Sequence, residues 1–114
     1  MTANDFRRIA LGMKDATEGA HMGHPDFRLN GRIFATIHPD PTCAMVNLTP
    51  EQQQRFVTDA PAIFVPEKGA WGVQGATAVQ LQSADEEAVG EALTLAWQNA
   101  NAKGPSPSRR KKVK

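Results

Sequence analysis

The stretch DFRLNGRIFATI, residues 26–37, decides the fold class because it predicts a two-stranded antiparallel hairpin. Asn30-Gly31 is the favoured central pair of a two-residue type I′ turn, in which both residues adopt a positive φ angle. Such a turn fixes the register of the two strands. Three pairs are then expected to lie opposite one another: Phe27 with Phe34, Arg28 with Ile33, and Leu29 with Arg32.

The two faces of this hairpin have different expected roles. Phe27 and Phe34 are expected to face the core, because two aromatic rings opposite each other stabilise a sheet when they are buried. The same register leaves three apolar side chains on the other face of strand 32–37, namely Ile33, Ala35 and Ile37. That second face is either covered by another element or a contact surface, and the sequence leaves both interpretations open.

Helices are predicted before and after the hairpin. In the first helix the apolar side chains recur with helical spacing and form one stripe, made of Phe6, Ile9, Ala10 and Met13. Thr2 and Asp5 give this helix a weak capping signal. In the second helix Thr49 is the cap, Pro50 takes the first helical position and Gln52 completes a capping box.

Further strands and a last helix complete the pattern. Residues 43–48 alternate as a strand, and residues 61–76 are rich in Pro and Gly and predict an irregular, packed loop that has room for a short strand. Residues 77–81 alternate as a half-buried strand, and Ser83 with Glu86 forms a capping box for the last helix. The order helix, three or four strands, helix, strand, helix predicts an α+β fold. We expect a single antiparallel sheet with the helices packed on one face, the first and last helices together.

Length and composition exclude several classes of protein. The 114 residues fit one domain, and 40% of them are hydrophobic, which is enough for a packed core. Cys43 is the single cysteine and excludes an intramolecular disulfide and a zinc cage of the CxxC type. Asp5, Arg7 and Arg8 interrupt the apolar run that a signal peptide needs, and no stretch approaches the roughly 18 apolar residues of a membrane span. We therefore expect a cytoplasmic protein.

The formal net charge of +1 hides a strong asymmetry. Residues 103–114 hold six of the thirteen Lys and Arg residues and no acid, so residues 1–102 keep seven cations against all twelve acids, a net charge of −5. The segment KGPSPSRRKKVK is too poor in apolar residues to offset its ordering entropy. We expect one domain over residues 1–101 and a disordered basic tail over residues 102–114.

Five segments carry a family resemblance: DFRRIAL, HMGHPDFRLNGRIFATIHPD, MVNLTPEQQQRF, GAWGVQGATAVQLQ and the LAW of the last helix. In this order and spacing they resemble the MmcQ/YjbR family of small bacterial proteins, whose fold is similar to that of CyaY and frataxin. The resemblance implies an antiparallel sheet packed on helices and a DNA-binding label that refers to a "double wing" of β-hairpins. It implies no catalytic residue. The acidic ridge of a frataxin-type iron site is missing, because Arg7 and Arg8 follow Asp5 in the first helix.

The expected function is a non-catalytic binding module that contacts DNA weakly and without sequence specificity, as the family label implies. The alternative is a module that binds a small molecule or a protein through the apolar face of strand 32–37 and the Trp71 loop. The scattered cations of the acidic body are also typical of an ordinary solvated surface. The candidate nucleic-acid-binding residues are Arg28, Arg32, Lys68, Trp71, Lys103, Arg109, Arg110, Lys111, Lys112 and Lys114.

The residues with metal-binding or nucleophilic chemistry form no recognised motif. His21 and His24 are three residues apart, which in one strand points them to opposite faces, so we expect no metal site and no cofactor. His38 and Cys43 flank a Pro-Asp-Pro turn and are a weak candidate for a Cys–His nucleophile pair that has no orienting partner. Trp71 is expected to fill the core beneath its loop in preference to stacking on a base or a ligand.

Any affinity for nucleic acid is expected to reside mainly in the basic tail. A flexible polycation gains free energy by releasing counterions from phosphates and needs no fixed geometry. The alternative is that the tail is a solubilising end or a cloning remnant without a role in binding.

Overall fold

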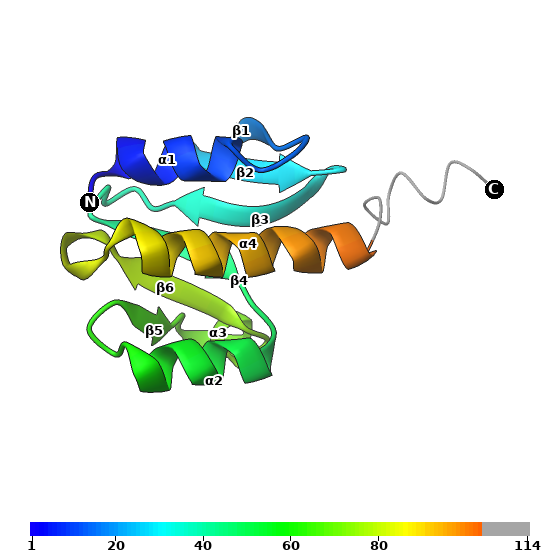
Figure 1. The fold of residues 1–114 in the computed structure, drawn as a ribbon. Coiled ribbons are helices and arrows are strands. Elements are labelled where there is room, and N and C mark those ends of the chain that lie inside the picture. Colours follow the sequence, from blue (N-terminus) through cyan, green and yellow to red (C-terminus); the bar gives the residue numbers. More distant parts are fainter. Residues whose placement is uncertain (104–114) are drawn as a thin grey trace.

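The computed structural model describes residues 1–103 (Figure 1). The elements follow in the order α1 (Ala3–Leu11), β1 (Thr17–His21), β2 (His24–Leu29), β3 (Arg32–Ile37), β4 (Cys43–Asn47), α2 (Pro50–Asp59), β5 (Phe64–Pro66), α3 (Gly69–Val73), β6 (Ala76–Gln80), the 3-10 turn η1 (Leu81–Ser83) and α4 (Glu86–Lys103). The strands form one antiparallel sheet in the order β1-β2-β3-β4-β6-β5. The predicted α+β class with a single antiparallel sheet is confirmed.

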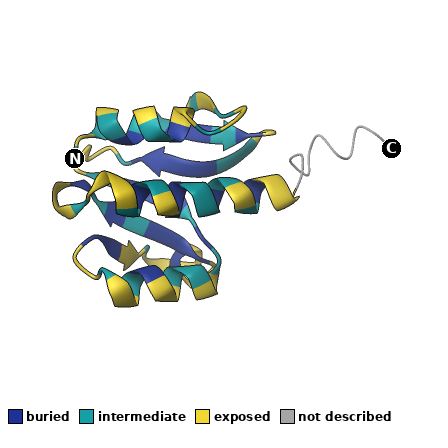
Figure 2. Cartoon of the chain, in the orientation of Figure 1, coloured by how far each residue is buried: buried dark blue, intermediate teal, exposed yellow. Residues whose placement is uncertain are grey.

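Helices α1, α2 and α4 lie on the same side of this sheet, with α4 across its middle (Figure 1). They pack a common core against the strands, and Figure 2 shows buried positions along the strands and on parts of the helices. The core includes Phe6, Ala10, Phe27, Phe34, Val46, Phe56, Phe64, Val79, Val89, Ala92, Leu93 and Ala96. The predicted placement of the first and last helices on one face is therefore correct. We call the opposite face of the sheet the open face.

Capping boxes start two of these helices as the sequence predicts. The Thr2 hydroxyl accepts a bond from the backbone N–H of Asp5, whose carboxylate accepts one from the N–H of Thr2. Thr49 and Gln52 make the same reciprocal pair at the start of α2. These bonds satisfy N–H groups that have no partner within the helix.

The predicted cap of the last helix is wrong by two residues. Ser83 belongs to η1, and α4 begins at Glu86. The side chain of Asp85 accepts the bond from the backbone N–H of Ala88 at 2.8 Å. An Asp at this position caps as well as a Ser and adds a negative charge that suits the helix N-terminus.

A β-bulge changes the register of the central hairpin. The type I′ turn forms as predicted, with φ of 55° at Asn30 and 81° at Gly31, and Arg28 lies opposite Ile33. Beyond that pair the register shifts, so that Phe27 lies opposite Ala35. The predicted Phe27–Phe34 pair is therefore wrong. Phe34 is the extra residue of the bulge, which lets it stay buried in the core without a partner across the ladder.

The bulge also determines which side chains of β3 lie on the open face. Because it restarts the alternation, Ala35 and Ile37 turn toward the helices and join the core, while Thr36 and the half-buried Ile33 face the other way. The expected apolar second face of strand 32–37 does not exist.

Two further elements, β1 and α3, were not predicted, and the short strand that the sequence allows within residues 61–76 is present. Residues 17–21 form β1, which pairs with β2 across a turn at Met22-Gly23. Within the Pro- and Gly-rich stretch 61–76, the chain forms the short strand β5 and the single helical turn α3. None of the described helices is both long and apolar enough to cross a membrane.

Candidate functional site

The open face of the sheet is lined mainly by polar side chains from five strands. The register and the alternation of side chains place Thr17, Gly19, His21, His24, Asp26, Arg28, Ile33, Thr36, Cys43, Met45, Asn47, Ala76, Ala78 and Gln80 on this face. None of the helices α1, α2 and α4 covers it, because all three lie on the other side of the sheet. It is therefore the candidate binding surface of the molecule.

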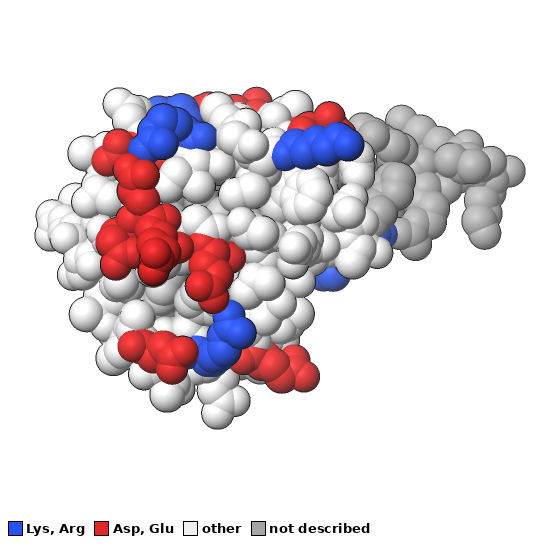
Figure 3. All heavy atoms as spheres, in the orientation of Figure 1, with Lys and Arg blue, Asp and Glu red and all other residues white. Residues whose placement is uncertain are grey.

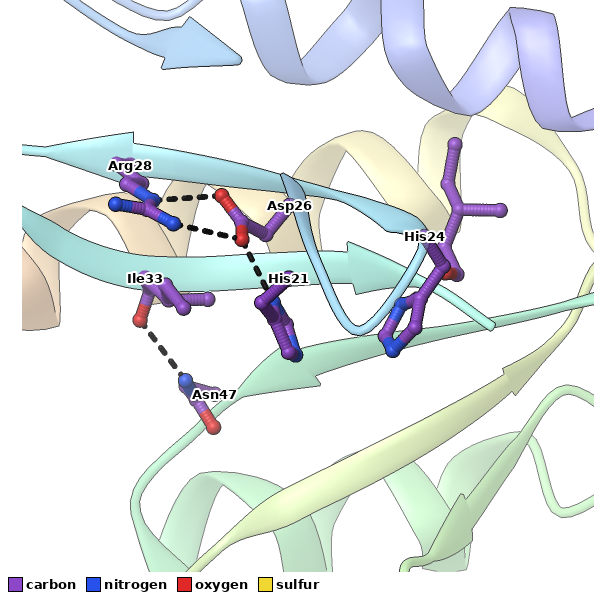
Figure 4. A network of polar contacts seen from close by, with 7 residues as sticks. His21, His24, Asp26, Arg28, Ile33 and Asn47 are labelled. Carbon is purple, nitrogen blue, oxygen red and sulfur yellow. Dashed lines mark hydrogen bonds and ion pairs between the residues drawn. The ribbon is translucent and has the colours of Figure 1, made fainter. Parts of the chain in front are cut away.

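A fully buried carboxylate, that of Asp26, is the centre of a hydrogen-bonded cluster on this face. Asp26 is 0% exposed and accepts two bonds from Arg28, at 2.7 Å from Nε and 3.0 Å from Nη2. His21 contacts it from β1, with Nδ1 2.7 Å from Oδ2 (Figure 4). Gly19 leaves room for this cluster, since a Cβ there would lie 3.0 Å from Asp26 Oδ1 and 3.1 Å from Arg28 Nε. The bidentate guanidinium offsets much of the penalty of burying a charge.

The contacts of Asp26 keep it ionised. The hydrogen bonds from Arg28 hold the pKa of the Asp26 carboxyl below its ordinary value, against the opposing effect of burial, and His21 lowers it further. The same bonds raise the pKa of Arg28. Arg28 therefore contributes no net charge of its own to the open face, because its charge is compensated by Asp26.

His21 and His24 lie beside each other on this face. They are directly opposite in the β1–β2 register, their ring centroids are 4.5 Å apart, and His24 Nδ1 lies 2.8 Å from the carbonyl oxygen of Ile37. The prediction that the two histidines point to opposite faces is wrong. It treats residues 21–24 as one strand, whereas a turn at Met22-Gly23 places the histidines on two paired strands.

Asn47 bridges the neighbouring strands on the same face. Its side-chain amide donates to the carbonyl oxygen of Ile33 at 2.9 Å (Figure 4). The β3–β4 ladder ends at the pair Ala35–Val46, so this bond extends the link between the strands beyond the ladder.

The predicted nucleic-acid-binding residues fall into separate groups. Arg28 and Arg32 belong to the β2–β3 hairpin, Lys68 is the N-cap of α3, and Trp71 lies within α3 near the β5–β6 edge. Lys103 is the last residue of α4. The remaining candidates, Arg109, Arg110, Lys111, Lys112 and Lys114, lie outside the described residues. The structure thus places Lys68 and Trp71 on one short element, whereas Arg28 lies on the open face and Arg32, which is opposite the core residue Leu29, lies on the other face of the hairpin, so these residues form no single patch.

Trp71 does not fill the core, contrary to the prediction. Its side chain is 70% exposed. The reason is the buried glycine beside it: a Cβ on Gly72 would lie 1.7 Å from the carbonyl oxygen of Glu67. The inner side of α3 therefore packs through its backbone, and the indole is left outside.

The weak candidate for a Cys–His nucleophile pair is not assembled. His38 Nε2 lies 2.7 Å from a carboxylate oxygen of Glu67, and the Cys43 thiol lies 3.6 Å from the side-chain oxygen of Gln80. Only the backbones of His38 and Cys43 are hydrogen-bonded to each other. Within residues 1–103, no group of three or more His, Cys, Asp or Glu side chains is arranged to hold a metal ion.

The acidic charge of the body lies mainly on the helix side of the sheet. Figure 3 looks onto this side and shows Asp and Glu gathered over it. The helices and the cap of α4 carry Asp5, Glu51, Asp59, Asp85, Glu86, Glu87 and Glu91. Four ion pairs engage the arginines there: Arg7 with Glu18, Arg8 with Asp5 and with Glu86, and Arg55 with Glu91. Among the strand residues that line the open face, the buried Asp26 is the one carboxylate.

A groove of about 200 Å³ lies between α2 and α4 on the helix side. Phe56 and Phe64 line it together with four carboxylates, those of Asp59, Asp85, Glu87 and Glu91. This acidic rim makes the groove unsuitable for a polyanion.

Comparisons with known proteins agree with this architecture. A family model described as YjbR matches residues 11–99. The crystal structure of the Deinococcus radiodurans protein DR2400, described as a DUF419 domain, is similar with a TM-score of 0.76 and 20% sequence identity, over 98% of this chain and 87% of that one. At this identity the likeness concerns the fold. No curated protein matches the chain.

Proposed function

Because this chain belongs to the YjbR family, we propose that it is a non-catalytic binding module that takes nucleic acid on the open face of its sheet. The observation that carries the proposal is the separation of charge between the two sides of the sheet. The net charge of −5 over residues 1–102 argues against DNA binding only if it is spread evenly. Seven of the twelve acids lie on the helices and the cap of α4, and among the strand residues that line the open face the one carboxylate, that of Asp26, is buried.

The open face also offers hydrogen-bond donors that suit phosphate and base edges. A guanidinium has five N–H donors, and Asp26 occupies two of those of Arg28, so about three remain for a ligand. His21 and His24 lie on the same face, half-buried and within reach of solvent, and because their Nδ1 atoms are bonded to Asp26 and Ile37, they offer Nε2 as an acceptor for donors on base edges. Contacts of this kind position a nucleic acid and give little sequence specificity.

In this proposal the basic tail supplies most of the affinity for nucleic acid, and the open face orients the bound nucleic acid. The six cations of residues 103–114 stand in a segment without acids. Cations of such a segment neutralise phosphates and release counterions without a fixed geometry.

Charge-insertion variants test the role of the open face. The double variant Thr17→Glu/Gln80→Glu adds two carboxylates on the open face, at an exposed and a half-buried position. Its matched control, Gln54→Glu/Gln98→Glu, adds the same charge at exposed positions of α2 and α4. In fluorescence anisotropy with labelled DNA at low salt, we expect the first variant to bind about tenfold more weakly, roughly 1.4 kcal/mol. Equal weakening by both variants would refute the open face as the binding surface.

A second candidate function, binding of a partner protein or small molecule, is supported by α3. Trp71 is 70% and Val73 is 78% exposed, and large exposed apolar side chains, Trp above all, mark contact surfaces. The same indole also suits stacking on an unpaired base. In a Trp97→Phe background Trp71 is the single tryptophan, so its emission reports on α3 alone. Quenching by single-stranded DNA supports base stacking, and unchanged emission in the DNA-bound protein would place α3 outside the nucleic-acid surface.

A further inference from the structure

We propose that His21 and His24 form a binding site for a divalent transition-metal ion such as Zn²⁺, Ni²⁺ or Cu²⁺ at the end of the β1–β2 hairpin. The two residues are the last pair of the ladder before the Met22-Gly23 turn. Their rings lie side by side, with centroids 4.5 Å apart, on the same side of the hairpin (Figure 4). This site does not depend on the nucleic-acid proposal.

The hydrogen bonds of the two rings fix which nitrogen carries the proton. A carbonyl oxygen only accepts, so the Nδ1 of His24 must donate its hydrogen to Ile37. Both carboxylate oxygens of Asp26 accept bonds from the Arg28 guanidinium, so Asp26 is an acceptor here as well and the Nδ1 of His21 must donate to it. A neutral imidazole carries one N–H, and each ring therefore keeps a free lone pair on Nε2.

This arrangement is the one that metal-binding histidines need. Such histidines donate their other ring N–H to a carboxylate or a backbone carbonyl, which fixes the tautomer, orients the ring and raises its basicity as a ligand. His21 has the carboxylate partner and His24 the carbonyl partner. Arg28 and complete burial hold Asp26 in place, so the orientation of His21 is preset before an ion binds.

The spacing and the exposure of the rings suit one shared ion. Metal–nitrogen bonds are about 2.0–2.1 Å long, so a single ion joins two nitrogens up to roughly 4 Å apart. Both rings are half-buried and reach solvent. The part of the chain that the structure describes supplies no third ligand of this kind nearby, so water or a group from a bound molecule completes the coordination. Imidazole ligands favour Cu²⁺, Ni²⁺ and Zn²⁺, with Cu²⁺ bound most tightly.

Calorimetric titration of the untagged full chain with Zn²⁺ and Ni²⁺ at pH 7.5 tests the site. We expect one ion per chain and a loss of affinity of at least about tenfold in His21→Ala and in His24→Ala, because each removes one of two ligands. His38→Ala is the matched control, since His38 is the third histidine and pairs with Glu67. A loss of affinity in the control as large as in the other variants would overturn the proposal, as would binding that survives in all three.

Nuclear magnetic resonance of the unaltered chain gives a second test that does not require the variants to fold. With ¹⁵N-labelled histidine, Zn²⁺ is expected to shift the Nε2 signals of His21 and His24 and to leave their Nδ1–H signals in place. Shifts at Nδ1, or at His38 instead, would contradict the site.

Discussion

At the scale of single residues, Asp26 is the group on which the open face depends. It is a fully buried anion held by Arg28 and His21. We expect Asp26→Asn, which keeps the shape and removes the charge, to lower the free energy of unfolding at pH 7 by about 2–3 kcal/mol, because charge-assisted hydrogen bonds are lost. Urea denaturation of both proteins measures the difference. A difference near zero would mean that the cluster contributes nothing to the stability of the sheet.

The pH dependence of that difference follows from the pKa of Asp26. The pKa of its carboxyl in the folded chain lies below the ordinary value of 3.8. Its stabilising contribution is therefore present above pH 3.8 and is lost as the pH falls through the lower, folded-state pKa. The pKa values of Asp5 and Asp40 are also lowered, but both proteins retain these residues. We expect the gap between wild type and Asp26→Asn to shrink in acid, and a gap that stays constant down to pH 2 would be inconsistent with this assignment.

Two glycines should respond in opposite ways to the same substitution. Gly75 has a φ of +118°, and a Cβ there would lie 1.9 Å from the carbonyl oxygen of Leu48. Gly90 lies inside α4 with nothing within 4 Å of its Cβ position. Gly75→Ala should destabilise the fold by about 3 kcal/mol or more, and Gly90→Ala should stabilise it by roughly 0.5–1 kcal/mol. Thermal unfolding measures both, and a Gly75→Ala protein as stable as the wild type would refute the close approach.

Single residues differ in how far they can be predicted from sequence. The caps Thr2 and Thr49 are predictable because their partners are three residues away in the chain. The contact between Asp26 and His21 is not, since it requires β1 to lie beside β2. The segment TEGAH shows no apolar alternation, so nothing local marks it as a strand. The one local sign of the β1–β2 hairpin is that a histidine stands on each side of Met22-Gly23.

At the scale of elements, the bulge in β3 is the main difference between the predicted and the observed register of the hairpin. It moves Ile37 into the core and leaves Ile33 on the open face. Ile37→Ala should lower the free energy of unfolding by about 2–4 kcal/mol, whereas Ile33→Ala should lower it by less than about 1 kcal/mol. Chemical denaturation distinguishes the two, and equal losses would favour the continuous register without a bulge.

The hairpin shows why a bulge escapes sequence reasoning. The turn at Asn30-Gly31 is set by backbone preference and is visible in the sequence. The bulge is a tertiary effect: one extra residue lets Phe34, Ala35 and Ile37 all face the helices. A strand that is apolar at successive positions fits either register, so only packing against α4 decides between them. The exposed position of Trp71 depends in the same way on a backbone contact, that of Gly72 with Glu67.

At the scale of the whole molecule, seven of the twelve acids lie on the helices and the cap of α4, and six of the thirteen cations lie in the tail. Removing residues 103–114 should weaken DNA binding and flatten its salt dependence. If all six cations engage duplex phosphates, the slope of log K against log salt should fall in magnitude by about 5, at about 0.9 per contact. Binding assays across a salt series measure this slope. A truncated chain with unchanged affinity and slope would exclude the tail as the main source of DNA affinity. Arg32 and Lys68 would then be the next residues to mutate.

The open face as a nucleic-acid surface is tested most directly by ¹⁵N–¹H correlation spectra of the full chain during titration with a short DNA. We expect backbone amides of β1, β2 and β4 and the side-chain amide of Asn47 to shift, because these strands line the open face. The amides of α2 and α4, on the acidic side, should stay in place. Shifts confined to the tail, or centred on α2 and α4, would contradict the assignment of the open face.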